Sequence, residues 1–197
     1  MHWARVASRL RHPDALTSKH MLACFLTPGD LDDWRHVSHF EVGRASLTGA
    51  EPVLSLGIIA GGTPSWRIDL HRGLGESCFQ DVRCVGSSVY IGYGQHVIVF
   101  ESEHESVALH PLDGYFGHLY VAADVETSES AFGLLAASAS ELLRFDDHGQ
   151  LLWRRSGLGI DGVLVDSISQ GMVLGRGEWD PPGGWRPYRL QLNSGES

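Results

Sequence analysis

Residues 142–153 read LLRFDDHGQLLW, and this stretch predicts two β-strands joined by a tight turn. Apolar side chains dominate both arms, and residues 146–149 form a turn in which Gly149 suits a positive backbone φ. We expect strands at residues 141–146 and 151–154. Phe145 and Trp153 are predicted to pack between sheets, because aromatic side chains bury large apolar areas.

Working outward, three passages of the chain begin alike and lead into strand-like sequence. They start at Gln80-Asp81-Val82, at Leu112-Asp113-Gly114 and at Ile160-Asp161-Gly162. A repeat of roughly 30 to 50 residues built from short strands is typical of propeller blades or stacked hairpin sheets. The units are placed at residues 79–111, 112–159 and 160–195, after a degenerate unit at 40–78 and an irregular or helical segment at 1–39.

Short runs of apolar or alternating residues, separated by turn compositions, predict further strands. They are expected at residues 40–47, 52–60, 65–70, 82–85, 89–93, 96–101, 107–110, 115–122, 133–137, 163–168, 172–176 and 188–192. Within the first 39 residues, the spacing of Trp3, Val6 and Leu10 predicts a short helix that Pro13 ends, and residues 31–35 suit either a helix start or a loop.

The predicted fold is therefore all-β, a single domain of 197 residues built from propeller-like repeated antiparallel sheets. Twenty-four glycines agree with frequent chain reversals. Three clear units and a degenerate one leave open whether the sheets close into a ring, since a closed propeller normally has four or more blades. A β-sandwich is the alternative.

The LLRFDDHGQLLW stretch resembles the blade repeat of quinoprotein-like (PQQ-type) β-propellers, in which a strand reaches an Asp, turns at a Gly and ends on a Trp. This resemblance implies the fold and indicates almost nothing about a cofactor. Together, LDGYFG at 112–117, LGIDGV at 158–163 and WDPPGGW at 179–185 also resemble an uncharacterised bacterial protein family. That second resemblance implies a bacterial origin and no assigned activity.

The net charge of −9 indicates which classes of partner the chain can bind. Nucleic-acid binding needs a basic surface to neutralise phosphates, so the charge argues against it and favours a protein partner with a basic surface. The sequence contains no run of about eighteen apolar residues, so it predicts no membrane span. Cys24, Cys78 and Cys84 form no CxxC pair, and reduced thiols favour a cytoplasmic location.

The most unusual local sequence is the passage from Gly175 to Tyr188, which is rich in proline, glycine and tryptophan. Such a passage is stiff, and preordered Trp and Arg side chains lose little entropy on binding. It is the predicted binding site, with Arg176, Glu178, Trp179, Asp180, Trp185, Arg186 and Tyr188 as its residues.

No catalytic motif, cofactor or metal site is predicted, so a non-enzymatic protein-interaction module is expected. An immunity protein that binds a toxin domain is one version. A small-ligand binder that stacks a sugar on Trp179 or Trp185 is an alternative. A metal-assisted hydrolase is another: it would use Asp81, Asp113 and Asp161, if they converge, with some of the eleven histidines, such as His36, His39 and His71.

Overall fold

The computed structural model describes residues 21–43, 51–75, 79–127, 129, 132–180 and 182–197. These residues form sixteen strands and two short 3-10 helices, and the strands assemble into four four-stranded sheets. The helix expected near Trp3 lies outside the described residues. None of the helices in the described ranges has the length and apolar character that a membrane crossing needs.

The first sheet has the strand order β1-β3-β4-β2, in which β2 runs parallel to β4. Its strands are β1 (Met21–Leu26), β2 (Ser38–Val42), β3 (Leu54–Ala60) and β4 (Thr63–Leu70). The expectation of an irregular or helical segment at 1–39 is wrong for β1, which pairs with β3 along its whole length. The short helix η1 (Leu31–Trp34) follows β1, where the sequence left helix and loop open.

The second sheet is an antiparallel meander, as the repeat unit at 79–111 predicts. Its strands follow chain order and are β5 (Gln80–Val85), β6 (Ser88–Tyr93), β7 (His96–Glu101) and β8 (Ser106–Pro111). Gly86 and Gly94 occupy the two tight turns with φ of +59° and +60°. These positive values explain why glycine stands at both reversals.

The third and fourth sheets contain the two remaining units, except that one strand of the unit at 112–159 belongs to the fourth sheet. The third consists of β9 (Phe116–Tyr120), β11 (Leu134–Ser138), β12 (Leu142–Phe145) and β13 (Leu151–Arg155). The fourth consists of β14 (Val163–Ser169), β15 (Met172–Glu178), β16 (Trp185–Gln191) and the two-residue β10 (Glu126–Thr127). Because β10 pairs in parallel with β14, the predicted boundary between units 112–159 and 160–195 does not hold for this strand.

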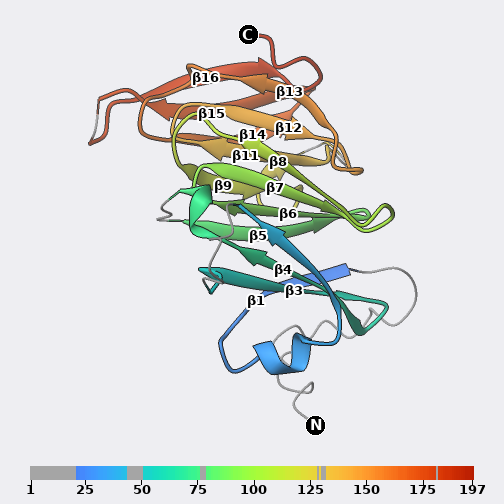
Figure 1. The fold of residues 1–197 in the computed structure, drawn as a ribbon. Coiled ribbons are helices and arrows are strands. Elements are labelled where there is room, and N and C mark those ends of the chain that lie inside the picture. Colours follow the sequence, from blue (N-terminus) through green and yellow to red (C-terminus); the bar gives the residue numbers. More distant parts are fainter. Residues whose placement is uncertain (1–20, 44–50, 76–78, 128, 130–131, 181) are drawn as a thin grey trace.

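The four sheets lie one after another in an open, propeller-like stack, and the first and fourth are at its opposite ends (Figure 1). Three buried apolar clusters fill the spaces between successive sheets. More than two sheets pack in series, so the β-sandwich alternative is wrong. In the part of the chain that the structure describes, the fold is all-β, with repeated sheets that do not close into a ring.

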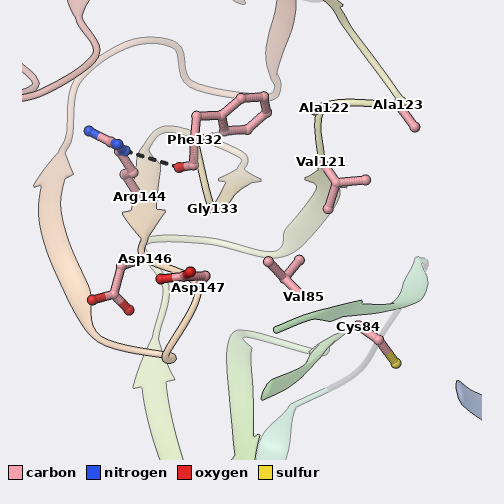
Figure 2. A pocket seen from close by; sticks show the side chains of 10 residues that line it. All are labelled: Cys84, Val85, Val121, Ala122, Ala123, Phe132, Gly133, Arg144, Asp146 and Asp147. Carbon is pink, nitrogen blue, oxygen red and sulfur yellow. Dashed lines mark hydrogen bonds between the residues drawn. The ribbon is translucent and has the colours of Figure 1, made fainter. Parts of the chain in front are cut away.

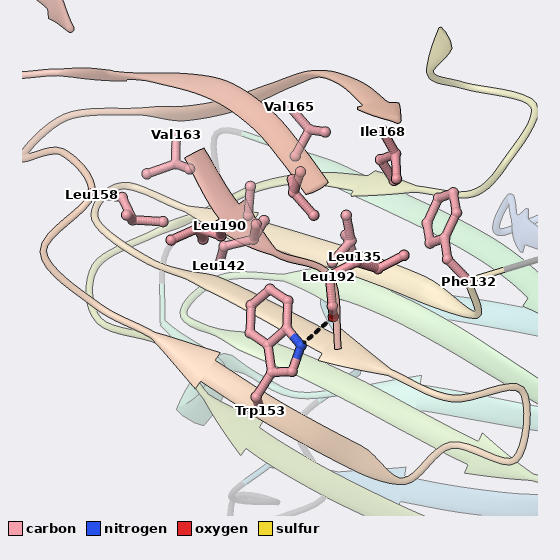
Figure 3. Packing of buried hydrophobic residues seen from close by; sticks show 12 residues of the cluster. Phe132, Leu135, Leu142, Trp153, Leu158, Val163, Val165, Ile168, Leu190 and Leu192 are labelled. Atoms are coloured by element: carbon pink, nitrogen blue, oxygen red, sulfur yellow. Dashed lines mark hydrogen bonds between the residues drawn. The ribbon is translucent and has the colours of Figure 1, made fainter. Parts of the chain in front are cut away.

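Trp153 shows how the predicted hairpin joins two sheets (Figure 3). Its ring belongs to the cluster between the third and fourth sheets, and its indole Nε1–H donates to the Leu192 carbonyl at 2.7 Å. Phe145 belongs instead to the cluster between the second and third sheets. Both aromatic residues are inter-sheet core, as predicted.

The short helix η1 covers part of the outer face of the first sheet. The ring of Trp34 lies directly over Gly57 of β3, where a Cβ would come within 2.4 Å of the indole. Next to it, the buried Asp69 carboxylate accepts two hydrogen bonds from Arg67, at 2.9 and 2.6 Å, and contacts His39 Nε2 at 2.8 Å. Burial alone would raise the pKa of Asp69, but the hydrogen bonds from Arg67, Ser55 and His39 prevail and lower it.

The connection that leads from the third sheet to the fourth also approaches Gly177 of β15 closely. A Cβ at this position would stand 1.6 Å from the Leu158 carbonyl oxygen, which is backbone and has no free rotation. We expect Gly177→Ala to destabilise the protein by about 2 kcal/mol or more, as overpacking does. Gly29→Ala is the control, because only Thr27 Oγ1, at 3.9 Å, lies near its Cβ. Urea unfolding of both variants checks this, and equal midpoints would contradict it.

The Asp69 network predicts a pH-dependent difference in stability. A lowered pKa in the folded state contributes stability above the unfolded pKa of about 4, and this contribution is lost as the pH falls through the folded value. We expect Asp69→Asn to cost about 3 kcal/mol at pH 7, because it leaves Arg67 without its buried partner. The difference from the original protein should shrink below pH 4. Urea unfolding at pH 7 and pH 3.5 measures the stability difference between the two proteins at each pH. The same difference at both pH values would refute the role of the Asp69 charge.

Candidate functional site

The predicted binding residues lie on and beside the β15–β16 hairpin, whose tip, residues 179–184 without Pro181, projects from the stack (Figure 1). Backbone hydrogen bonds order this tip. The Trp179 N–H donates to the Gly184 carbonyl at 3.0 Å, and the Gly184 N–H returns to the Asp180 carbonyl at 2.9 Å. The Glu178 carboxylate accepts from the Gly183 N–H at 2.7 Å. Glu178 therefore serves the shape of the tip.

Two arginine–tryptophan pairs cover opposite faces of the hairpin. The guanidinium carbon of Arg186 lies 5.6 Å from the ring centroid of Trp179, and that of Arg176 lies 5.9 Å from Trp185. Directly opposed residues of antiparallel strands share a face, so the pairing of Glu178 with Trp185 places these two pairs on different sides. Each tryptophan is half-buried beneath a cation, an arrangement that favours a fixed ring orientation.

Arg176 is further fixed by a second partner. Its Nε and Nη2 atoms donate to the two carboxylate oxygens of Asp166 on β14, each at 2.9 Å. These hydrogen bonds and the nearby negative charge raise the pKa of Arg176. Arg186, by contrast, has only its stacking contact on Trp179 among the interactions of the described residues. Arg186 is thus the more available cation of the two.

Tyr188 anchors the hairpin from below. Its hydroxyl donates to the Leu164 carbonyl at 2.9 Å, and its ring packs against the cluster between the third and fourth sheets. Burial raises the pKa of Tyr188 above its usual range. We therefore assign Tyr188 to supporting the hairpin rather than to contact with a ligand.

A pocket of about 370 Å³ opens beside Trp179. Ile160, which is 55% exposed, stands at this pocket, and Asp113 and Ser140 supply polar groups to it. The remaining lining comes from Gly114, Ala139, Gly157 and Gly159. The pocket thus lies between the starts of the second and third predicted repeat units.

A row of large apolar side chains runs from this pocket across the first residues of the three repeat units. Tyr115 donates its hydroxyl hydrogen to the Asp161 carbonyl, and its ring lies 6.2 Å from that of Phe79, which is 50% exposed. We name Phe79, Tyr115, Ile160 and Trp179 the apolar row. Sequence reasoning missed Phe79, Tyr115 and Ile160 as site residues, although each stands within two positions of a repeated aspartate.

The repeated aspartates themselves do not form a shared site. Asp81 accepts the Val82 N–H at 2.8 Å and pairs with Arg83. Asp113 donates its backbone N–H to Glu141 at 2.7 Å, while Asp161 accepts from Tyr115. Among the described residues, no three His, Cys, Asp or Glu side chains are grouped to hold a metal ion. The metal-assisted hydrolase therefore finds no support in this arrangement.

A second pocket, of about 460 Å³, lies between the second and third sheets (Figure 2). Its polar side chains already have structural partners. Arg144 donates to the carbonyls of Phe132 at 3.2 Å and Leu192 at 2.6 Å, and Asp146 accepts two N–H groups of its own turn. Burial raises the pKa of the Cys84 thiol to about 11, so this thiol is protonated and unreactive at neutral pH.

No family model matches this sequence, and no curated protein matches it significantly. Among solved structures, the WD40 domain of Neurospora crassa Pan2 is similar to this chain at 13% identity with a TM-score of 0.37. The match covers 73% of this chain and 47% of that domain, so the chain spans about half the length of the structure that it matches. The fold assignment rests on the strand order and packing of this chain.

The contact between Tyr188 and Leu164 predicts a measurable loss of stability. Tyr188→Phe keeps the ring over the core but leaves a buried carbonyl without its donor, which costs about 1 to 2 kcal/mol. Urea unfolding followed by tryptophan fluorescence measures the change. Arg189→Ala, at an exposed position on the same strand, should alter stability by less than about 0.5 kcal/mol. Equal effects of the two substitutions would contradict the anchoring role.

Proposed function

We propose that this chain is a non-enzymatic protein-interaction module whose binding surface is the Trp179 hairpin together with the apolar row. The observation that carries the proposal is the exposure of large apolar side chains along this one surface. Phe79 and Ile160 are half-exposed; Phe79 lies beside the ring of Tyr115, and Ile160 lines the same pocket as Trp179. Contiguous apolar patches on a protein surface mark interaction sites.

The order of the hairpin supports the same function. Its tip is held by three hydrogen bonds, and Arg186 stacks on Trp179, so few rotamers are lost when a partner binds. Trp, Tyr and Arg are also the residues that contribute most to measured binding energy at interfaces. Among the predicted binding residues, we therefore place Trp179, Asp180 and Arg186 in direct contact with the partner, with Trp185 and Arg176 behind them.

The partner class follows from charge. A net charge of −9 favours association with a basic protein domain, because complementary charge speeds encounter and disfavours wrong partners. A bacterial toxin domain blocked by an immunity protein in the cytoplasm is the finer version of this proposal. The resemblance to a bacterial protein family and the absence of a recognised catalytic motif in the sequence support that version.

The pocket beside Trp179 favours a second candidate, a small-ligand binder. Its volume of about 370 Å³ and the oxygens of Asp113 and Ser140 suit a sugar ring stacked on the indole. The two candidates use the same tryptophan. Only the small-ligand candidate predicts that a small molecule, without a protein partner, changes the environment of Trp179.

Substitution at the surface tests the protein-interaction function. We expect Trp179→Ala to weaken the complex with a basic partner at least about thirtyfold, as loss of an interface hot spot does. Candidate partners come from genes beside this one and from affinity capture, and affinity is measured by calorimetry. The matched control is Arg35→Ala, an exposed position beside η1 at the opposite end of the stack, which should bind normally.

The outcome against the proposal is equally definite. A partner that binds the Trp179→Ala variant with unchanged affinity, while urea unfolding shows both variants intact, would exclude the hairpin as the binding surface. A sugar panel that quenches tryptophan fluorescence in the original protein but not in Trp179→Phe would favour the small-ligand candidate instead.

A further inference from the structure

The outer edges of the four sheets differ in how they are protected. The strands β1, β5, β9 and β14 lie near one another on one side of the stack, which leaves β2, β8, β13 and β16 as the outer edge strands. Three of them carry charged residues, and β16 also has a proline: these are Glu41 in β2, Arg154 and Arg155 in β13, and Arg186, Pro187 and Arg189 in β16. Such residues prevent the addition of another strand.

The edge strand β8 lacks this protection. Its sequence SVALHP contains no Asp, Glu, Lys or Arg, and its proline stands at the last position. Ala108 and Leu109 are exposed near its centre, where Leu109 shows 43% of its surface. An uncharged edge of six residues is a template for pairing with a further strand.

The backbone pattern of β8 fixes which groups are free for such pairing. The Leu112 N–H donates to the Gln95 carbonyl at 2.8 Å, next to the His96 and Pro111 pair. Hydrogen-bonded and non-hydrogen-bonded pairs alternate in antiparallel strands, so Ala108 and His110 bond inward to β7. The N–H and C=O groups of Val107 and Leu109 therefore point away from the sheet.

We propose that β8 pairs in antiparallel fashion with β8 of a second copy of this chain, forming a two-fold symmetric dimer with a continuous eight-stranded sheet. Val107 of one copy exchanges two backbone hydrogen bonds with Leu109 of the other, and the reverse pair forms two more. Ala108 then faces its own symmetry mate across the axis. An interface in which the same patch meets itself is the commonest symmetry of protein oligomers.

Charge at the two ends of β8 favours the antiparallel orientation. Glu105 directly precedes the strand, and at its far end Arg154 donates to the Pro111 carbonyl at 2.8 Å. In the proposed register, Glu105 lies opposite Pro111 of the other copy and so approaches the Arg154 guanidinium. Parallel pairing would instead bring like ends together. At both ends of the dimer interface a carboxylate thus approaches a guanidinium, and these groups keep their present partners, Trp66 for Glu105 and Glu141 for Arg154.

Sedimentation velocity at increasing protein concentration tests the dimer. We expect a concentration-dependent dimer in the original protein and at least tenfold weaker association in Ala108→Lys, because two ammonium groups would meet at the two-fold axis. Ala108 is exposed, so urea unfolding should show a normal fold in this variant. A protein that stays monomeric up to concentrations on the order of 100 µM, or a dimer that Ala108→Lys leaves unchanged, overturns the proposal.

Cysteine cross-linking tests the register. Opposed Cα atoms of a non-hydrogen-bonded antiparallel pair lie about 4.5 Å apart, which a disulfide can span. We expect Ala108→Cys to form a covalent dimer under mild oxidation. Ser106→Cys should not, because its symmetry mate would lie roughly 13 Å away along the strand. The original protein, treated alike, controls for its native thiols. Cross-linking of Ser106→Cys as efficient as that of Ala108→Cys would refute this register.

Discussion

The burial of both faces of the middle sheets is the constraint on which the rest of the structure depends. A single four-stranded sheet cannot shield its apolar residues, and the central strands β6 and β11 are buried almost throughout. Each therefore needs a neighbour on either side, and the three apolar clusters supply it. Close approach of the sheets requires small residues at certain points, such as Gly92 beneath the ring of Phe116.

An open stack has two end sheets, each with one outer face that no other sheet covers, and the two outer faces differ here. At the first sheet, Trp34 and the Arg67–Asp69–His39 network cover the outer face. At the fourth sheet, the outer face of β15 carries the Arg176–Asp166 ion pair beside Met172 and Leu174. Terminal units of other stacked folds need such polar outer faces to stay in solution. Both ends of the described stack therefore present charged side chains on the outer face.

The sequence predicts most strands of the repeat units because their signals are local. The runs VYIGY and HVIVF are separated by a glycine turn, and both strands appear within one residue of their expected bounds. The strand β1 escaped prediction because its partner, β3, comes nearly thirty residues later and no turn joins them. The two-residue β10 pairs in parallel with a strand of the next unit, which no short-range pattern can indicate.

The candidate site was predictable to a similar degree. Composition singled out the Trp179 hairpin, since proline, glycine and tryptophan rarely gather without a conformational reason. It could not separate Tyr188, which supports the hairpin, from Trp179, because that difference depends on the Leu164 carbonyl of another strand. Nor could it show that Phe79 and Ile160 share a surface. A single apolar residue beside a turn carries no periodic signal, and only the stacking of the units brings such residues together.

The hairpin and the β8 edge belong to different sheets and share no residue, so the two surfaces can be occupied independently. A dimer joined at β8 presents two copies of the hairpin at a fixed separation. A partner that is itself dimeric can then bind both hairpins, and the second contact forms at a high effective concentration. Even modest affinity at one hairpin would give a long-lived complex under these conditions. If both proposals hold, the open stack combines a recognition element at its end with a self-association element at its edge, and the sheets between them set their geometry.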